Sequence, residues 1–175
     1  MAGARADIAV MGARAARAGV MLRQAESLPK LRHIVAQAVC QHATDHDYLA
    51  ELTTWSGRYG SLSGVPARNT PKSNPTAPVP ARSFAGPTLG ESSDVVAEDD
   101  AAVVLALGTK DDSSMTRLRA GEATSLVLLT ATALGLASCP VTEPLEIPET
   151  RDAVQTDVFG DSGFPQMLLR IGWAP

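Results

Sequence analysis

The chain has 175 residues, of which 45% are hydrophobic and 19% charged, enough for one globular domain with a sizeable core. Its formal net charge of −4 gives no long-range field that would attract nucleic acid, and an aromatic content of 4% offers few platforms for stacking single-stranded bases. Composition therefore argues against a nucleic-acid-binding protein and predicts a single domain over residues 1–175.

The N-terminal part predicts two helices around a short strand. Residues 4–18 repeat apolar side chains at helical spacing, and Gly19 stops the pattern. Residues 20–24 then alternate as a short strand does, and Pro29 can open a second helix. The apolar face of this second helix follows the i, i+3, i+4, i+7, i+8 pattern at Leu31, Ile34, Val35, Ala38 and Val39.

A third helix is expected to follow, with Thr44 as its N-cap. Three large side chains share one of its faces: Tyr48, Leu52 and Trp55. Trp55 and Tyr59 stand just before a long loop, so both could line a ligand pocket under a lid. Core packing is the alternative for Trp55, because large aromatic side chains supply much of a protein's buried apolar surface.

Residues 60–98 interrupt the regular pattern. Six of the chain's twelve prolines fall between Pro66 and Pro87, among Ser, Thr, Asn and Gly, and no periodic apolar face survives there. A loop of this length is usually functional, disordered or laid over a neighbouring part of the molecule. An arm or lid is favoured by apolar residues spaced as anchors, at Leu62, Val65, Val79, Phe84 and Leu89.

The C-terminal part begins with a strand and a long helix. Residues 101–107 form an unbroken apolar run, typical of a central strand covered on both faces. Residues 117–137 predict a helix that is apolar on nearly all sides from Leu126 onward, so we expect it to be enclosed. Its polar residues, and Pro140 just beyond it, argue against a membrane span.

Extended chain at residues 138–142, a helix from Pro148 and a strand at residues 167–171 complete the pattern. Four candidate strands among five helices predict a layered α+β or α/β sandwich around one sheet. Strand order does not follow from the pattern.

No short catalytic motif is present in the sequence. It contains no GxGxxG after a strand, no GxxxxGK[ST], no HExxH and no Cys-His zinc set. His42 and His46 lie four residues apart, but Thr44 and Asp45 interrupt the helix between them. We therefore expect exposed histidines at helix ends rather than a metal site.

Cys40 and Cys139 match no CxxC spacing, which predicts reduced thiols in a cytoplasmic protein. Cys139 stands before a proline and is expected to be a small buried thiol. The acidic pair Asp111 and Asp112 is interpreted as part of a solvated face.

Three segments together resemble the Acg-type NAD(P)H nitroreductases of the nitroreductase superfamily. They are WSGRYGSLSGVPARNTP at residues 55–71, GEATSLVLLTATALGLASCPVTEPL at 121–145 and PQMLLRIGWAP at 165–175. The resemblance covers almost the whole chain and is to the C-terminal half of these proteins. It implies a nitroreductase-like α+β fold, with a mixed sheet of about four strands flanked by helices and a long Pro-rich loop.

The resemblance also implies FMN as cofactor, NAD(P)H as reductant and a nitroaromatic or quinone-like small molecule as acceptor. Five consecutive residues would contact the flavin: Ser138, Cys139, Pro140, Val141 and Thr142. The N–H of Thr142 would lie near the flavin N5, and Trp55 and Tyr59 would belong to the substrate side or lid. No side chain is needed as acid or base, since the hydride chemistry belongs to the cofactor. From the residues alone, residues 138–142 could equally be a plain core strand.

The chain also departs from the family pattern. The Arg- and Ser-containing phosphate motif of the N-terminal half is absent, and so is the basic segment after the last strand. Because a phosphate removed from water needs cationic or N–H partners, FMN affinity of this chain alone is expected to be low.

Three hypotheses follow from the resemblance and the departures. The first is an FMN-dependent oxidoreductase, and the second is a flavin-binding protein without turnover. The third is an inactive half-domain that self-associates or pairs with a missing N-terminal half. Neither nucleic acid nor membrane is expected as a partner.

Overall fold

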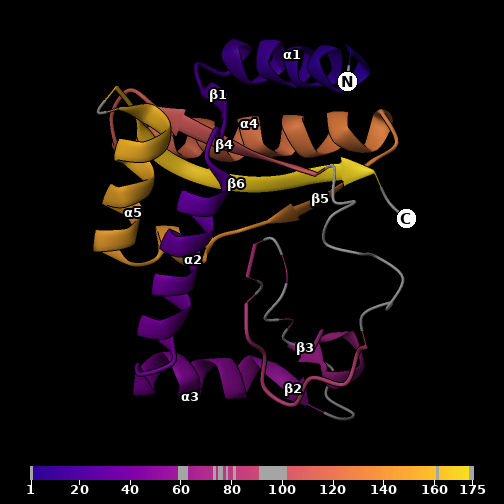
Figure 1. The fold of residues 1–175 in the computed structure, drawn as a ribbon, viewed down its shortest axis with the longest axis vertical. Coiled ribbons are helices and arrows are strands. Elements are labelled where there is room, and N and C mark those ends of the chain that lie inside the picture. Colours follow the sequence, from indigo (N-terminus) through magenta and orange to yellow (C-terminus); the bar gives the residue numbers. More distant parts are fainter. Residues whose placement is uncertain are drawn as a thin grey trace.

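A four-stranded sheet between two layers of helices forms the body of the protein (Figure 1). The computed structural model describes residues 2–58, 63–72, 74, 77, 79–80, 82–90, 102–160 and 162–173. The strands are β1 (Met21–Gln24), β4 (Val103–Thr109), β5 (Leu136–Pro140) and β6 (Phe164–Trp173). Their order in the sheet is β1-β4-β6-β5, so β5 is an edge strand.

All three pairings in this sheet are antiparallel. Parallel pairing occurs instead in a separate small ladder between β2 (Ser56–Arg58) and β3 (Val65–Pro66). Each strand of the main sheet falls on a segment expected to be extended, and β4 is central, as its unbroken apolar run predicts. The predicted α+β class with about four strands between helices is confirmed.

The two faces of the sheet carry two hydrophobic clusters, because successive residues of a strand point to opposite faces. Leu105 and Leu107 of β4 face the helices α1 (Ala2–Arg17) and α4 (Ser114–Ala133). Val104 and Ala106 of β4 face α2 (Leu28–His42) and α5 (Pro148–Val154). Figure 1 shows these layers, with α1 and α4 above the sheet and α2 and α5 below it.

Capping fixes where two of the helices begin. The helix α3 (His46–Trp55) is capped by Asp45, whose carboxylate accepts hydrogen bonds from the N–H groups of Asp47 and Tyr48. The expected cap, Thr44, is one residue too early and bonds to the carbonyl of Gln41 instead. Ser113 caps α4 through the N–H of Thr116.

The long helix α4 is not enclosed, contrary to the expectation from its composition. It buries a stripe of small and β-branched residues, whereas Leu129 is 68% exposed. The other exposed large residues of α4 are Met115, Leu118 and Leu126. The positions are separated by about one or two helical turns and so share one side of α4, which therefore exposes large apolar residues outside the core. No helix in the described part of the chain is long and apolar enough to cross a membrane.

The described part of the Pro-rich loop has its own polar framework. The carbonyl of Ala67 accepts hydrogen bonds from the side chains of Thr70 and Thr88, which joins two distant stretches of the loop. Gly57 has a φ of +75°, and a Cβ there would lie 2.0 Å from the carbonyl oxygen of Ala85. The loop therefore crosses β2 so closely that only glycine fits.

The expected loop anchors have different outcomes. Val79 is buried against α2 and the sheet, as an anchor should be. Val65 and Leu89 are exposed, while Phe84 is half-buried. Leu62 lies outside the described residues.

Candidate functional site

The segment expected to contact flavin lies at the free edge of the sheet. Ser138, Cys139 and Pro140 are exposed in β5, and Val141 and Thr142 are half-buried just beyond it. The N–H of Val141 donates to the carbonyl of Leu168 in β6 at 2.9 Å. Because antiparallel pairs alternate, the main-chain groups of Ser138 and Pro140 point away from β6, towards the open side.

Proline suits this position for a physical reason. Pro140 has no N–H, and a strand tolerates that only where the missing donor would face away from the ladder. A plain buried core strand, the alternative for residues 138–142, does not match an exposed edge.

The expectation that Cys139 is buried is wrong. Its side chain is exposed, because β5 has a neighbour on one side only. Cys40, on α2, is exposed as well, and both thiols are free.

Immediately after this edge, the chain enters a turn of 3-10 helix, Glu143–Leu145, which carries a buried carboxylate. Glu143 is only 5% exposed. The hydroxyl of Tyr48 donates to its Oε1 at 3.3 Å, and Nδ1 of His42 lies 3.5 Å from the same oxygen. His42 and Tyr48 stack in parallel, with their ring centroids 4.0 Å apart. The turn is thus joined to both α2 and α3.

For His42, the prediction of an exposed histidine at a helix end is wrong. It is 7% exposed, and its Nδ1 forms no hydrogen bond of good geometry to any described residue, so its contact with Glu143 is electrostatic. The other histidine of that expectation, His46, is exposed.

Arg82, from the Pro-rich loop, closes this cluster from outside. Its guanidinium donates to Oγ1 of Thr142 at 3.0 Å and to the carboxylate of Glu146. Its Nε lies 3.6 Å from Glu143, and its cationic carbon lies 5.7 Å from the centre of the Tyr48 ring. One loop residue thus holds the end of the candidate flavin segment.

The charges of this cluster reinforce one another. Burial, followed by the negative charge of Glu143, raises the pKa of Tyr48 to about 12. Tyr48 is therefore a neutral phenol that can donate to Glu143 at physiological pH. Burial alone would lower the pKa of Arg82, but the carboxylates of Glu143 and Glu146 outweigh it and raise that pKa.

Beside this cluster is a cleft of about 540 Å³. It is lined by Tyr48, Glu51, Leu52, Trp55, Arg82 and Glu146. The first four recur at i, i+3, i+4 and i+7, so one face of α3 forms a wall of the cleft. Trp55 thus lines a pocket, as one of its two interpretations expects, while Tyr59 lies outside the described residues.

A larger cleft, of about 810 Å³, lies between β1 and the π-helical turn Gln155–Phe159. Its cationic residue, Arg23, already donates to the carbonyls of Val158 and Phe159 and to the hydroxyl of Ser162. These bonds give Arg23 a structural role, so the smaller cleft beside Thr142 is the better candidate site.

Curated proteins are similar in sequence to most of this chain. A Mycobacterium tuberculosis protein (strain H37Rv), provisionally named an NAD(P)H nitroreductase, is 66% identical over 169 residues, 97% of this chain and 49% of that protein. The protein named acg from the same strain, under the same provisional naming, is 35% identical over 139 residues, 75% of this chain and 39% of its own length. The chain therefore spans about half the length of the curated relatives it matches.

The fold agrees with these relatives. The crystal structure of a nitroreductase with bound FMN from Bacteroides fragilis NCTC 9343 superimposes with a TM-score of 0.56, over 97% of this chain and 76% of that one. The chain belongs to the nitroreductase superfamily. At 14% identity the B. fragilis protein shows the shared fold alone, and no protein-family model matches the sequence.

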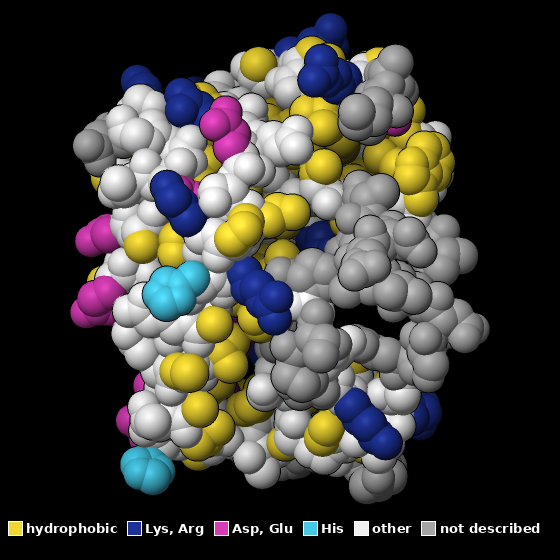
Figure 2. Space-filling model, in the orientation of Figure 1, with side chains coloured by type: hydrophobic (Ala, Val, Ile, Leu, Met, Phe, Trp, Pro, Cys, Tyr) yellow, Lys and Arg dark blue, Asp and Glu magenta, His cyan; other side chains and the backbone are white. Residues whose placement is uncertain are grey.

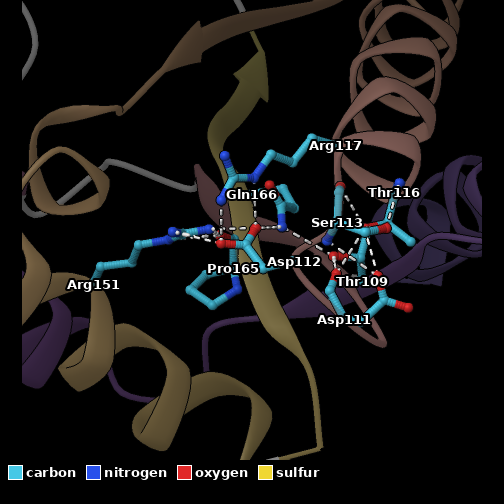
Figure 3. Close-up of polar contacts among 9 residues, drawn as sticks. All are labelled: Thr109, Asp111, Asp112, Ser113, Thr116, Arg117, Arg151, Pro165 and Gln166. Atoms are coloured by element: carbon cyan, nitrogen blue, oxygen red, sulfur yellow. Dashed lines mark hydrogen bonds and ion pairs between the residues drawn. The ribbon is translucent and has the colours of Figure 1, made fainter.

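A second polar network of this nitroreductase-superfamily chain lies apart from the cleft (Figure 3). Asp112 accepts hydrogen bonds from Arg117 in α4, from Arg151 in α5 and from Gln166 in β6. These bonds, that of Arg117 first, lower the pKa of Asp112 below its usual range. The interpretation of Asp112 as part of a solvated face is thus wrong: its carboxylate fastens the start of α4 to β6 and α5.

Sequence reasoning missed His42, Glu143 and Arg82. For His42 a signal existed: it continues the buried stripe of α2 at four residues from Ala38 and seven from Val35. No comparable signal exists for Arg82, because the residues to which it donates hydrogen bonds are 60 or more residues away along the chain. No group of three or more His, Cys, Asp or Glu residues able to hold a metal ion occurs in the part of the chain that the structure describes.

Proposed function

We propose that this chain forms one side of an FMN site in an NAD(P)H-dependent oxidoreductase of nitroreductase type. The acceptors would be nitroaromatic or quinone-like small molecules. The observation that carries this proposal is the exposed edge Ser138–Thr142, in a chain 66% identical to a protein provisionally named an NAD(P)H nitroreductase.

The residues at this edge fit the ring of a flavin. Pro140 and Val141 offer an apolar wall, and main-chain groups of β5 on the open side are free of the ladder. The N–H of Thr142 would serve as the donor near N5, held in place by the bond from Arg82 to the Thr142 side chain. Ser138 and Cys139 would extend the same wall. When bound, FMN supplies the hydride chemistry, so these residues need only bind and orient the ring.

The phosphate of FMN fits this chain less well. Two cations lie near this edge. Arg82 is already paired with Glu143 and Glu146, and Arg170, which lies opposite Cys139 in β6, also has an interaction of its own. Partners for the phosphate would therefore come from a second body, either another copy of this chain or the half of the relatives that this chain does not span.

The exposed apolar face of α4 is where that second body would pack. Leu118 and Leu129 are 61% and 68% exposed, and large apolar side chains left exposed on one side of a helix are typical of an interface. We place the pairing there because the opposite face of α4 is already filled by α1 and the sheet.

The visible spectrum of the purified chain tests this function. When a second body is present, we expect yellow protein whose flavin absorbance survives desalting and is bleached by NADPH or NADH. The chain alone should retain less flavin. Flavin that neither nucleotide bleaches would favour a binding protein without turnover. Colourless protein that takes up no added FMN, alone or with a second body, would contradict the proposal.

A further inference from the structure

The apolar face of helix α3 is only partly covered by the residues that the structure describes. No residue of α3 is buried, although Tyr48, Leu52 and Trp55 share one face. By contrast, α2 buries five residues with a similar spacing. An amphipathic helix that does not use its apolar face for the core leaves that face free for a ligand or partner.

Trp55 gives this face a stacking surface. Its side chain is 54% exposed and lines the 540 Å³ cleft, whereas Tyr48 is already covered by His42 on one side and by Arg82. An indole face that is open to a concave site attracts flat rings, and cationic groups most of all, because its π-cloud is negative.

The charge of the cleft also favours cationic ligands. Its lining includes the carboxylates of Glu51 and Glu146 and the guanidinium of Arg82, so one net negative charge remains. Glu143, buried behind them, adds a second, which His42 can at most offset. Tyr48 adds no charge, because its pKa is about 12. Counted over the described residues, the lining is therefore negative with or without a charge on His42.

We infer that this cleft binds flat aromatic cations, of which N-alkylated pyridinium and quinolinium rings are examples. Trp55 stacks on the ring, Glu51 faces its positive charge, and Leu52 packs against its edge. The cleft disfavours carboxylated or phosphorylated rings, because Glu51 and Glu146 would repel them. In the proposed oxidoreductase, on which this part rests, the preferred electron acceptors would be nitroaromatic or quinone-like rings that carry a positive charge, and the phosphates of the reductant lie outside this cleft.

Trp55 itself can report binding. The chain has two tryptophans, Trp55 and Trp173, and Trp173 is 67% exposed at the end of β6. In Trp173→Phe protein, without flavin, we expect N-methylquinolinium chloride to quench the fluorescence of Trp55 with a saturable curve. Binding should weaken as salt is added, because the charges are exposed. Trp55→Phe protein, which keeps Trp173, should give only linear, collisional quenching.

Charge variants make the test specific. Glu51→Gln should weaken binding of the cation by about three- to tenfold, because it removes a charge close to the ring. Glu149→Gln, which changes an exposed carboxylate on α5 that does not line the cleft, is the matched control and should change nothing. Neutral quinoline should bind more weakly than the cation, and quinoline carboxylate more weakly still.

Three results would overturn the inference: linear quenching of Trp55, equal affinity for the cation and the carboxylate, or no effect of Glu51→Gln. The measurement needs no flavin, so its outcome is separate from that of the visible spectrum. If the cation binds saturably but the chain takes up no FMN, either alone or with a second body, the proposed function is overturned and the cleft's preference for cations still stands.

Discussion

The consecutive helices α2 and α3 have similar apolar patterns, but only α2 buries its apolar face. In α2 the stripe of Leu31, Val35 and Ala38 is fully buried against the sheet. In α3 the stripe of Tyr48, Leu52 and Trp55 lines an open cleft, and no residue of that helix is buried. Hydrophobic periodicity thus predicts that a face will be covered, but not whether by the protein's own core or by a ligand.

Truncating one leucine on each helix should give the largest contrast. Leu31 is 0% exposed, so Leu31→Ala should lower the free energy of unfolding by about 2–5 kcal/mol. Leu52 is half-buried at the cleft, and Leu52→Ala should cost about 1 kcal/mol or less. Urea unfolding curves measure both values. Equal losses would mean that α3 belongs to the core as α2 does.

Of the two carboxylates near α2 and α3, the buried one should contribute more to stability than the exposed one. Glu143 is buried beneath His42 and Tyr48, whereas the side chain of Glu146 is 35% exposed. Glu143→Gln should destabilise the protein by about 1–3 kcal/mol, since it weakens charge-assisted contacts in a buried site. Glu146→Gln should cost about 1 kcal/mol or less, as exposed ion pairs do. Thermal unfolding compares the two, and a larger loss for Glu146 would contradict the proposed arrangement.

Releasing the loop residue that covers this cluster should have a smaller, local effect. Arg82→Gln removes the contacts with Glu143 and Glu146, so the loop should be cleaved several-fold faster in limited proteolysis while global stability falls by about 1 kcal/mol or less. Lys72→Gln, at an exposed loop position, is the control and should leave cleavage unchanged. Equal cleavage of all three proteins would show that Arg82 does not hold the loop.

A further effect should appear only at alkaline pH. The pKa of Tyr48 is raised from 10.0 to about 12, so the unfolded chain ionises this phenol first. The stabilisation is complete below pH 10 and is lost as pH rises towards 12. Tyr48→Phe protein should therefore lose less stability across this interval than the unaltered chain does, as followed by thermal unfolding. Parallel losses in both proteins would place Tyr48 in contact with solvent.

Much of the fold could be predicted because it depends on local signals. The apolar run of β4 and the periodicity of α2 each reflect burial that is visible within a few residues of sequence. The end of α4 was placed four residues too late, since Leu134 and Leu136 continue its apolar composition beyond Ala133. The open face of α4 could not be seen either, because a leucine facing a partner and a leucine facing the core look alike in sequence.

The candidate site was only partly predictable. Trp55 was found because it ends a helix before an unusual loop, and the edge Ser138–Thr142 followed from family resemblance. The cluster of His42, Glu143 and Arg82 joins a helix end, a turn and a loop, and such contacts depend on the three-dimensional arrangement rather than on spacing. The prediction that Cys139 is buried failed for the same reason, because an edge strand and a central strand can have the same amino-acid composition.

Alkylation of the two exposed cysteines, compared with and without FMN, tests the central claim most directly. Cys139 lies within the proposed flavin edge, whereas Cys40 lies on α2 and serves as an internal control in the same molecule. Alkylation by iodoacetamide, followed site by site with mass spectrometry, should slow several-fold at Cys139 when FMN is bound and stay unchanged at Cys40. If FMN binds, as its fluorescence quenching would report, and Cys139 reacts as fast as before, the flavin does not lie against this edge.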